Sequence, residues 1–255
     1  MNVGIGLPIG DPTTLLTWAR RADAGPFRTL GLLDRLVYDN PEPLVALAVL
    51  AGATSRIRVQ TEVLLAPLRD TALLAKQAAT VDRMTGGRLV LGLGIGGRED
   101  DHRAAGTDPR TRGRRLDEQM AVMRRLWSGE PYGDGVGPIG PAPARPTGPE
   151  VLFGGFRPAA LERVARWGDG FLAAAAPSWA DGLFETVRTY WRRYGRDGGP
   201  AYPSTRRRAD APTRRRADAP TLRRSWRDVG CRGRPGWCAR NGGRRRRGRR
   251  PAAGR

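Results

Sequence analysis

The feature that most constrains the fold is an alternation that runs through the first 200 residues. Short apolar runs, typical of buried parallel strands, are followed six times by longer segments with helical spacing. The strand-like runs are residues 3–9, 27–34, 56–65, 88–95, 151–155 and 170–174. The helix-like segments are residues 12–24, 41–54, 71–85, 113–128, 158–167 and 179–194. Six successive βα units predict an α/β fold with a parallel sheet.

Two architectures satisfy this alternation. One is a doubly wound open sheet, and the other is a (β/α)8 barrel of the TIM type of which about six βα units are present. Residues 129–149 are rich in Gly and Pro and are expected to form a surface loop. Asn40 before Pro41 predicts an N-cap for the second helix, and Gly86 after Thr85 predicts the end of the third.

The positive charge of the chain is concentrated near its end. The formal net charge is +20, but residues 201–255 hold 19 Arg and three Asp, which leaves 26 basic and 22 acidic residues before them. The segment TRRRADAP occurs twice in tandem, from Thr205 and from Thr213. We therefore divide the chain into a globular domain (residues 1–198) and an Arg/Pro/Gly-rich tail (residues 199–255). The tail is expected to be disordered, because it can bury little apolar surface.

The tail has two interpretations. It either binds nucleic acid or another anionic surface, or it replaces a native C-terminus that was lost or frame-shifted. The second is favoured, because the composition changes where two further βα units would complete a barrel. Cys231 and Cys238, the only cysteines, lie in the tail without a nearby histidine, so no zinc site is expected. The domain lacks cysteines, a basic leader and a long apolar run, and we expect a cytoplasmic protein without a membrane partner.

A literal G-x-G-x-x-G match lies in the fourth unit, at Gly92, Gly94 and Gly97. A dinucleotide-binding turn requires a helix that opens at the glycines and an acid about 20 residues later at a strand end. Residues 98–106 are short and polar, so no helix is expected there, and Asp117 falls inside the next helix. The glycines are better explained by close helix–strand packing, or by a bare strand end against which a flat ring can lie.

The residues around this motif resemble the luciferase-like monooxygenases. That family has a Thr-x-Val turn, a helix with Ala-Lys-Gln-x-Ala-x-x-Asp, then Ser/Thr-Gly-Gly-Arg-Leu and a glycine-ended fourth strand. The same elements stand here at Thr61–Val63, Ala75–Asp82, Thr85–Leu89 and Gly92–Gly97. The resemblance continues with Gly-Gly-x-x-Pro-Ala-Ala-Leu at Gly154–Leu161 and covers residues 1–198.

The resemblance implies a (β/α)8 barrel that binds FMN or the deazaflavin F420 at the C-terminal ends of its strands. It implies an oxidoreductase, either a monooxygenase that uses reduced FMN and oxygen on a small organic substrate or a hydride-transfer enzyme that uses reduced F420. A flavin reductase or another supplier of reduced cofactor, and a second copy of the chain, are the partners it suggests. The cofactor supplies the chemistry in such enzymes, which agrees with a sequence that offers no catalytic triad.

Candidate site residues follow from the resemblance and from elementary chemistry. Those expected at the ring are Thr61, Val63, Gly94, Gly96 and Gly97. Those expected at the phosphate are Arg98, Gly154, Gly155, Phe156 and Arg157, because the last four precede a helix whose N-terminus favours anions. Glu62 stands where the family has a small or apolar residue. His102, the only histidine, is either a general base near the ring or an exposed loop residue. Two further readings are an inactive, incomplete barrel and nucleic-acid binding through the tail.

Overall fold

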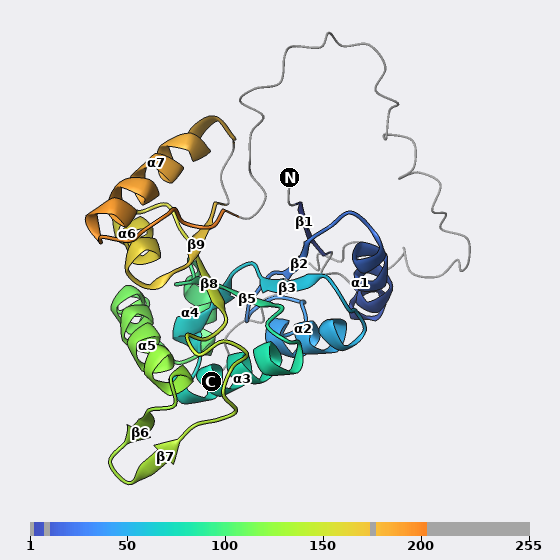
Figure 1. Cartoon of the computed structure of the whole chain (residues 1–255), viewed down its shortest axis with the longest axis horizontal. Helices are drawn as coiled ribbons and strands as arrows, with labels where there is room; N and C mark the ends of the chain where they lie inside the picture. The colour runs from blue at the N-terminus through green and yellow to red at the C-terminus, as the bar shows by residue number, and fades with distance from the viewer. Residues whose placement is uncertain (1–2, 8–10, 174–176, 203–255) are drawn as a thin grey trace, which may run out of the picture. The chain divides into compact units, whose positions relative to one another are not determined.

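The computed structural model describes residues 3–7, 11–173 and 177–202 (Figure 1). The predicted tail from residue 203 onward, with both cysteines, lies outside the described residues. The central sheet is built from parallel strands. These are β1 (Gly4–Gly6), β2 (Thr29–Leu32), β3 (Arg58–Thr61), β4 (Leu64–Leu65), β5 (Leu89–Gly94), β8 (Glu150–Gly154) and β9 (Gly170–Leu172).

The strand order decides between the two predicted architectures. Neighbouring strands follow the chain order, β1-β2-β3-β5-β8-β9, with β4 paired to β5. A doubly wound sheet reverses its order at a switch point, whereas a barrel continues in one direction. The sheet is therefore of the barrel type, and it curls into part of a (β/α)8 barrel with its helices around the outside (Figure 1). The expected incomplete barrel is confirmed for the described residues.

Seven α-helices are present within the described ranges. They are α1 (Leu15–Ala24), α2 (Pro43–Gly52), α3 (Thr71–Met84), α4 (Glu99–Ala104), α5 (Arg112–Trp127), α6 (Pro158–Trp167) and α7 (Pro177–Arg193). Short 3₁₀ turns, Pro12–Thr14 and Ala66–Leu68, precede α1 and α3. On α5 the apolar side chains at i, i+4, i+7 and i+11 form one helical face that is buried: Leu116, Met120, Met123 and Trp127.

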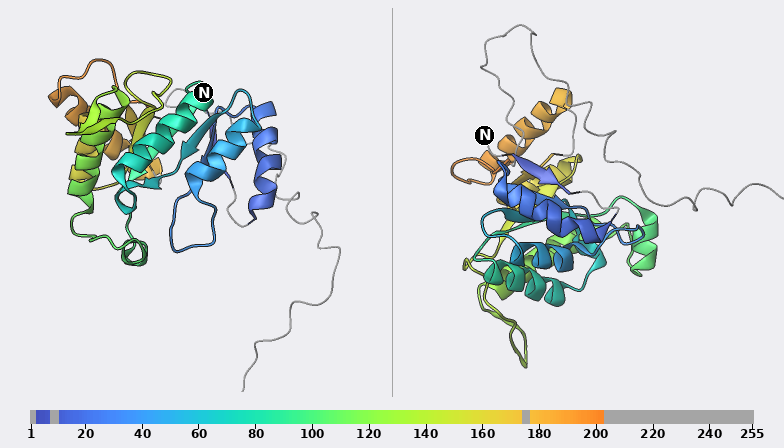
Figure 2. Two further views of the ribbon diagram at one scale, coloured as in Figure 1. Left: turned by 90° about the horizontal axis from the view of Figure 1, so that it is seen from below. Right: turned by 90° about the vertical axis from the view of Figure 1, so that its right-hand side faces the viewer.

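Two local predictions are wrong, and a third needs an addition. The N-cap of α2 is Glu42 rather than Asn40, because its carboxylate accepts the N–H of Val45 at 2.7 Å and Pro43 begins the helix. A six-residue helix, α4, occupies the segment after Gly97 where none was expected. The expected surface loop contains an antiparallel hairpin, β6 (Pro131–Gly133) with β7 (Val136–Pro138), which projects from the rest of the domain (Figures 1 and 2).

The chain returns to the sheet just before the last described residue. Ala201 lies beside β9 as a parallel bridge to Gly170, and its carbonyl accepts the N–H of Phe171 at 2.9 Å. The ring of Tyr202 packs edge-on against Phe184 of α7, with centroids 4.7 Å apart. Ala201 and Tyr202, which the composition placed in the tail, thus contact the domain at the outer edge of β9.

Candidate active site

A cavity of about 770 Å³ opens at the C-terminal ends of the strands. That volume lies within the range of about 300–1,000 Å³ typical of small-molecule sites. It is lined by Val63, Gly94, Gly96, Gly97, Gly154, Gly155, Phe156 and Arg157, so all predicted cofactor-binding residues except Thr61 and Arg98 meet in one place. Because parallel strands present their C-terminal ends at one edge, segments distant in the sequence converge here.

A β-bulge shapes the floor of this cavity. Gln60 pairs with Val90 and Leu64 with Leu93, so four positions on one strand face three on β5. The extra residue splits the predicted strand 56–65 into β3 and β4 and turns the Glu62–Val63 segment out of the ladder. The Glu62–Val63 peptide bond is cis. Bulges of this kind re-aim side chains beside active sites.

The glycines of β5 make room chiefly for this bulge. A Cβ on Gly92 would lie 2.1 Å from the carbonyl oxygen of Thr61, and one on Gly94 would lie 2.5 Å from Cγ2 of Val63. Val63 also faces Gly154, whose Cβ would be 3.1 Å from its Cγ1. Of the three glycines of the motif, Gly97, just beyond β5, has no atom within 4 Å of a built Cβ. Gly92 and Gly94 are therefore packed closely, but against the neighbouring strand and the bulge and not against a helix, as the packing explanation had it. Val63, which they accommodate, lines the cavity.

Thr61 lies beneath the cavity. It is fully buried, and its hydroxyl donates to the carbonyl of Gly92 at 2.7 Å. It thereby ties the end of β3 to β5 and holds the base of the bulge. Its predicted contact with a ring would have to be made by the backbone.

The carboxyl group of Glu62 reaches across the inner face of the sheet. It fills the slot that Gly31 leaves, where a Cβ would lie 2.1 Å from Cδ of Glu62, and Oε2 lies over Gly6. Oε1 accepts a hydrogen bond from Nε2 of Gln60 at 3.0 Å. Burial raises the pKa of the Glu62 carboxyl, although the hydrogen bond from Gln60 opposes the shift. Within the described residues Glu62 is the one carboxylic acid that lines the cavity.

The opposite wall carries positive charge. Arg112 at the start of α5 and Arg157 at the N-cap of α6 line the cavity, and neither makes an ion pair within the described part of the chain. Arg163 also lines it, but its guanidinium is held by Asp117 at 2.7 and 2.9 Å. Gly155, at φ +149°, packs closely against Ala160: a Cβ on Gly155 would lie 2.6 Å from the Cβ of Ala160. Such a helix start with uncompensated arginines suits an anionic group.

His102 and Arg98 do not line the cavity, although His102 lies directly behind Ile95 and Gly96, which do. His102 is completely buried in α4, with Nε2 3.2 Å from the carbonyl oxygen of Ile95 and Nδ1 2.9 Å from Oγ1 of Thr107. Because a carbonyl oxygen only accepts, Nε2 carries the proton. Both nitrogens are thus engaged, which supports a role for His102 in holding the turn after β5. Arg98 is largely exposed and pairs with Asp100 at 2.9 Å.

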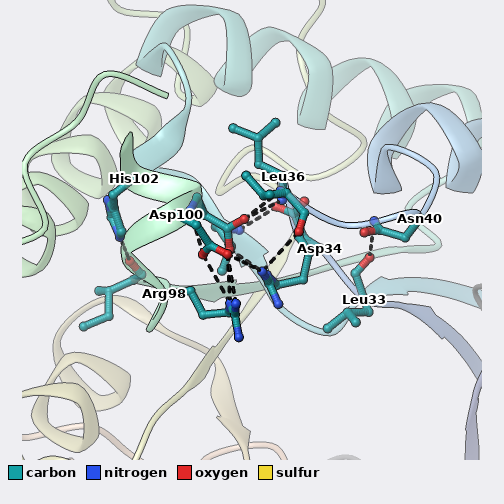
Figure 3. Close-up of polar contacts among 12 residues, drawn as sticks. Leu33, Asp34, Leu36, Asn40, Arg98, Asp100 and His102 are labelled. Atoms are coloured by element: carbon teal, nitrogen blue, oxygen red, sulfur yellow. Dashed lines mark hydrogen bonds and ion pairs between the residues drawn. The ribbon is translucent and has the colours of Figure 1, made fainter. Parts of the chain in front are cut away.

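A network of buried acids fixes the loop after β2 beside these residues (Figure 3). Asp34 accepts hydrogen bonds from the backbone N–H of Leu65 and from Arg69, both at 2.8 Å. Asp101 accepts from Nε of Arg35 at 2.6 Å and from the N–H groups of Leu36 and Val37 at 3.1 and 2.7 Å. The loop is thereby attached to α4 and to the strand that borders the cavity.

Sequence reasoning missed several residues that line the cavity. Gly4 and Gly6 clear its inner side, and their i, i+2 spacing in a strand was a usable signal because it places both on one face. Gln60 and Arg112 gave no comparable signal, since their positions depend on the bulge and on the approach of α5. Together the lining residues form an apolar surface in which glycines leave the backbone uncovered, with one carboxyl group and two arginines that lack an ion-pair partner in the described part of the chain. This set fits a flat ring that carries an anionic arm.

Comparison with known proteins gives a consistent result. A family model described as "Luciferase-like monooxygenase" matches residues 3–251. An uncharacterised protein of Mycobacterium tuberculosis is 31% identical over 166 residues, which cover 62% of this chain and 59% of that protein. An F420-dependent glucose-6-phosphate dehydrogenase of Kineococcus radiotolerans is 30% identical over 62% of this chain and 50% of its own length. The chain thus spans only 50–59% of the length of these relatives.

A solved structure shows the same fold. The oxygenating constituent of 3,6-diketocamphane monooxygenase from Pseudomonas putida, in complex with FMN, superposes with a TM-score of 0.67. The sequences are 17% identical, and the superposition covers 77% of this chain and 64% of that one. Within the described residues, no helix is both long and apolar enough to cross a membrane.

Proposed function

The chain belongs to the luciferase-like monooxygenase family, and we propose that it is a flavin-dependent oxidoreductase that uses reduced FMN and oxygen on a small organic substrate. The observation that carries the proposal is a cavity at the C-terminal strand ends that joins an apolar surface, cleared by glycines, to two arginines without an ion-pair partner in the described part of the chain. FMN, when bound, supplies the redox chemistry. A flavin reductase would supply its reduced form.

The chain's own residues would bind and orient the cofactor. Arg157 and the first turn of α6 would hold the phosphate, with Arg112 on the facing helix. Val63, on the bulge, and the glycine-ended β5 would provide the surface for the ring. The apolar lining would exclude water from the reacting atoms.

The runner-up is F420-dependent hydride transfer. It is favoured by one observation, the 30% identity to a relative that carries this activity in its name. Both functions place a flavin-like ring in the same cavity, and they differ in the cofactor bound and in the need for oxygen.

Cofactor titration of the full chain tests the proposal. We expect FMN to bind with quenching of its fluorescence, riboflavin to bind more weakly because it lacks the phosphate, and F420 to bind least. With reduced FMN, substrate turnover should consume oxygen. Tight binding of F420 without FMN binding would replace the proposal with its runner-up, and binding of neither would refute both.

A further inference from the structure

Glu62 is partnered differently from the two acids that are buried near the site. Asp34 and Asp101 are each held by an arginine and by backbone N–H groups. Glu62, which is half-buried, has one neutral partner, the amide of Gln60, and no cation within ion-pair distance in the described part of the chain. A carboxylate that is largely removed from water is ordinarily paired, because its desolvation is costly.

The second carboxyl oxygen of Glu62 is directed to the space that a ligand would occupy. Oε1 is taken by Gln60, while Oε2 lies over the bare backbone of Gly6, which also lines the cavity. The positive groups on the cavity wall, Arg112 and Arg157, come from α5 and α6 rather than from the strands that carry Glu62. Gly6 and Gly31, on the neighbouring strands β1 and β2, contribute no charge. The acid and the two arginines that line the cavity therefore come from different elements, the segment between β3 and β4 and the starts of two helices.

We propose that Glu62 is the specificity-determining residue of the cavity and that it selects a substrate bearing an amine, whose ammonium group would pair with Oε2. The inference rests on the proposed function, since it names the substrate class of the same site. An ammonium supplies the missing counter-charge and donates the hydrogen bond that Oε2 lacks. Burial, which raises the pKa of Glu62, makes the ionised carboxylate less stable, and a bound ammonium would offset that cost.

The variant Glu62→Gln isolates this role. A glutamine keeps the length of the side chain and an oxygen that can still accept from Gln60, so the slot over Gly31 stays filled. It presents an NH₂ group in place of Oε2, and an ammonium can only donate, so the pairing is lost. Glu130→Gln, on an exposed side chain that pairs with Arg125, removes one carboxylate without touching the cavity and is the matched control.

The experiment measures binding of three six-carbon probes, n-hexylamine, 1-hexanol and hexanoate, to the full chain without cofactor by titration calorimetry at about pH 8. This pH lies well above the ordinary range of a carboxyl group, which favours the ionised form of Glu62, and it keeps the amine protonated. In the wild type we expect the amine to bind more tightly than the alcohol. Glu62→Gln should weaken the amine about tenfold or more, the value of one hydrogen bond between charged groups, and should change the alcohol much less. Circular dichroism verifies that the variant is folded.

Equal affinity of hexylamine for wild type and Glu62→Gln overturns the inference, as does a wild type that binds hexanol but not hexylamine. If the protein binds FMN while either of these results is found, the inference fails and the proposed function stands. If neither FMN nor F420 binds while the amine preference depends on Glu62, the proposed function fails and the amine site remains.

Discussion

Gly94→Ala is the substitution whose effect follows most directly from the structure. An added Cβ would lie 2.5 Å from Cγ2 of Val63, well inside van der Waals contact, and the next atom, Cβ of Val63, would be 3.5 Å away. Overpacking of this kind costs about 1–3 kcal/mol. For a domain of this size that corresponds to a fall of about 2–12 °C in Tm.

Removing the obstructing methyl group should restore what Gly94→Ala loses. In Val63→Ala the nearest remaining atom is the Cβ at 3.5 Å, an ordinary contact. The double variant should therefore be more stable than the sum of the two single effects by about 1 kcal/mol or more. Gly97→Ala, whose Cβ would meet no atom within 4 Å, is the control and should change stability by less than about 0.5 kcal/mol.

The stability of the wild type and of all four variants is measured by thermal and urea unfolding followed by far-UV circular dichroism. Two results would refute the reasoning. One is a Gly94→Ala protein as stable as the wild type. The other is strict additivity of the Gly94 and Val63 substitutions, since it would mean that the two side chains do not meet.

Three further predictions concern charge. Asp101→Asn keeps the oxygen that accepts the two backbone N–H groups but sets an NH₂ against Arg35, so the free energy of unfolding should fall by about 1.5–3 kcal/mol. The same change at Asp100, whose side chain is 34% exposed against 1% for Asp101, should lower Tm much less, and equal effects would contradict the role of burial. Burial raises the pKa of Glu62 above its ordinary value of 4.5, so ionisation of this carboxyl destabilises the fold as pH rises. Glu62→Gln should therefore have a higher Tm than the wild type at about pH 8 and the same Tm at about pH 4. A difference in Tm that does not depend on pH would exclude this cause. Arg157→Gln should weaken FMN about tenfold and leave riboflavin unchanged, whereas equal weakening of both would remove the arginine from the phosphate site.

The architecture could be predicted because its signals are local. Each apolar run and each helical face is readable in about ten residues, and six repeats leave few topologies. The strand order, which separates a barrel from a doubly wound sheet, is not a local property. The barrel was predicted only through the motifs from Thr61 to Gly97, because their order and spacing carry the family resemblance.

The local errors have separate physical causes. Pro41 and Pro43 both suit the first turn of α2, and the reach of the Glu42 carboxylate to Val45 decides between them. His102 is expected in a loop, because the segment after Gly97 is short and polar. In the structure this segment forms α4, and the ring of His102 lies against the carbonyl oxygen of Ile95, just after β5.

The parts of the candidate site that lie at glycine-rich strand ends and at a helix N-terminus were predicted from the sequence. The parts that depend on how strands and helices pair in the folded protein were missed. Gly154, Gly155 and Arg157 border an ordinary strand-to-helix turn, which the sequence reveals. The position of Glu62 depends on the one-residue bulge between the pairing of β3 with β5 and that of β4 with β5. The residues around Glu62 do not by themselves indicate this register. The same limit applies to Gln60.

The fit of Glu62 into the slot over Gly31 has a consequence for the evolution of this site. Any side chain at position 31 and a long side chain at position 62 would claim the same space, so position 31 cannot gain a side chain while position 62 keeps a long one. A lineage that acquires bulk at position 31 must first shorten position 62. The acid therefore requires the glycine, and relatives that retain both are the ones expected to share a ligand preference.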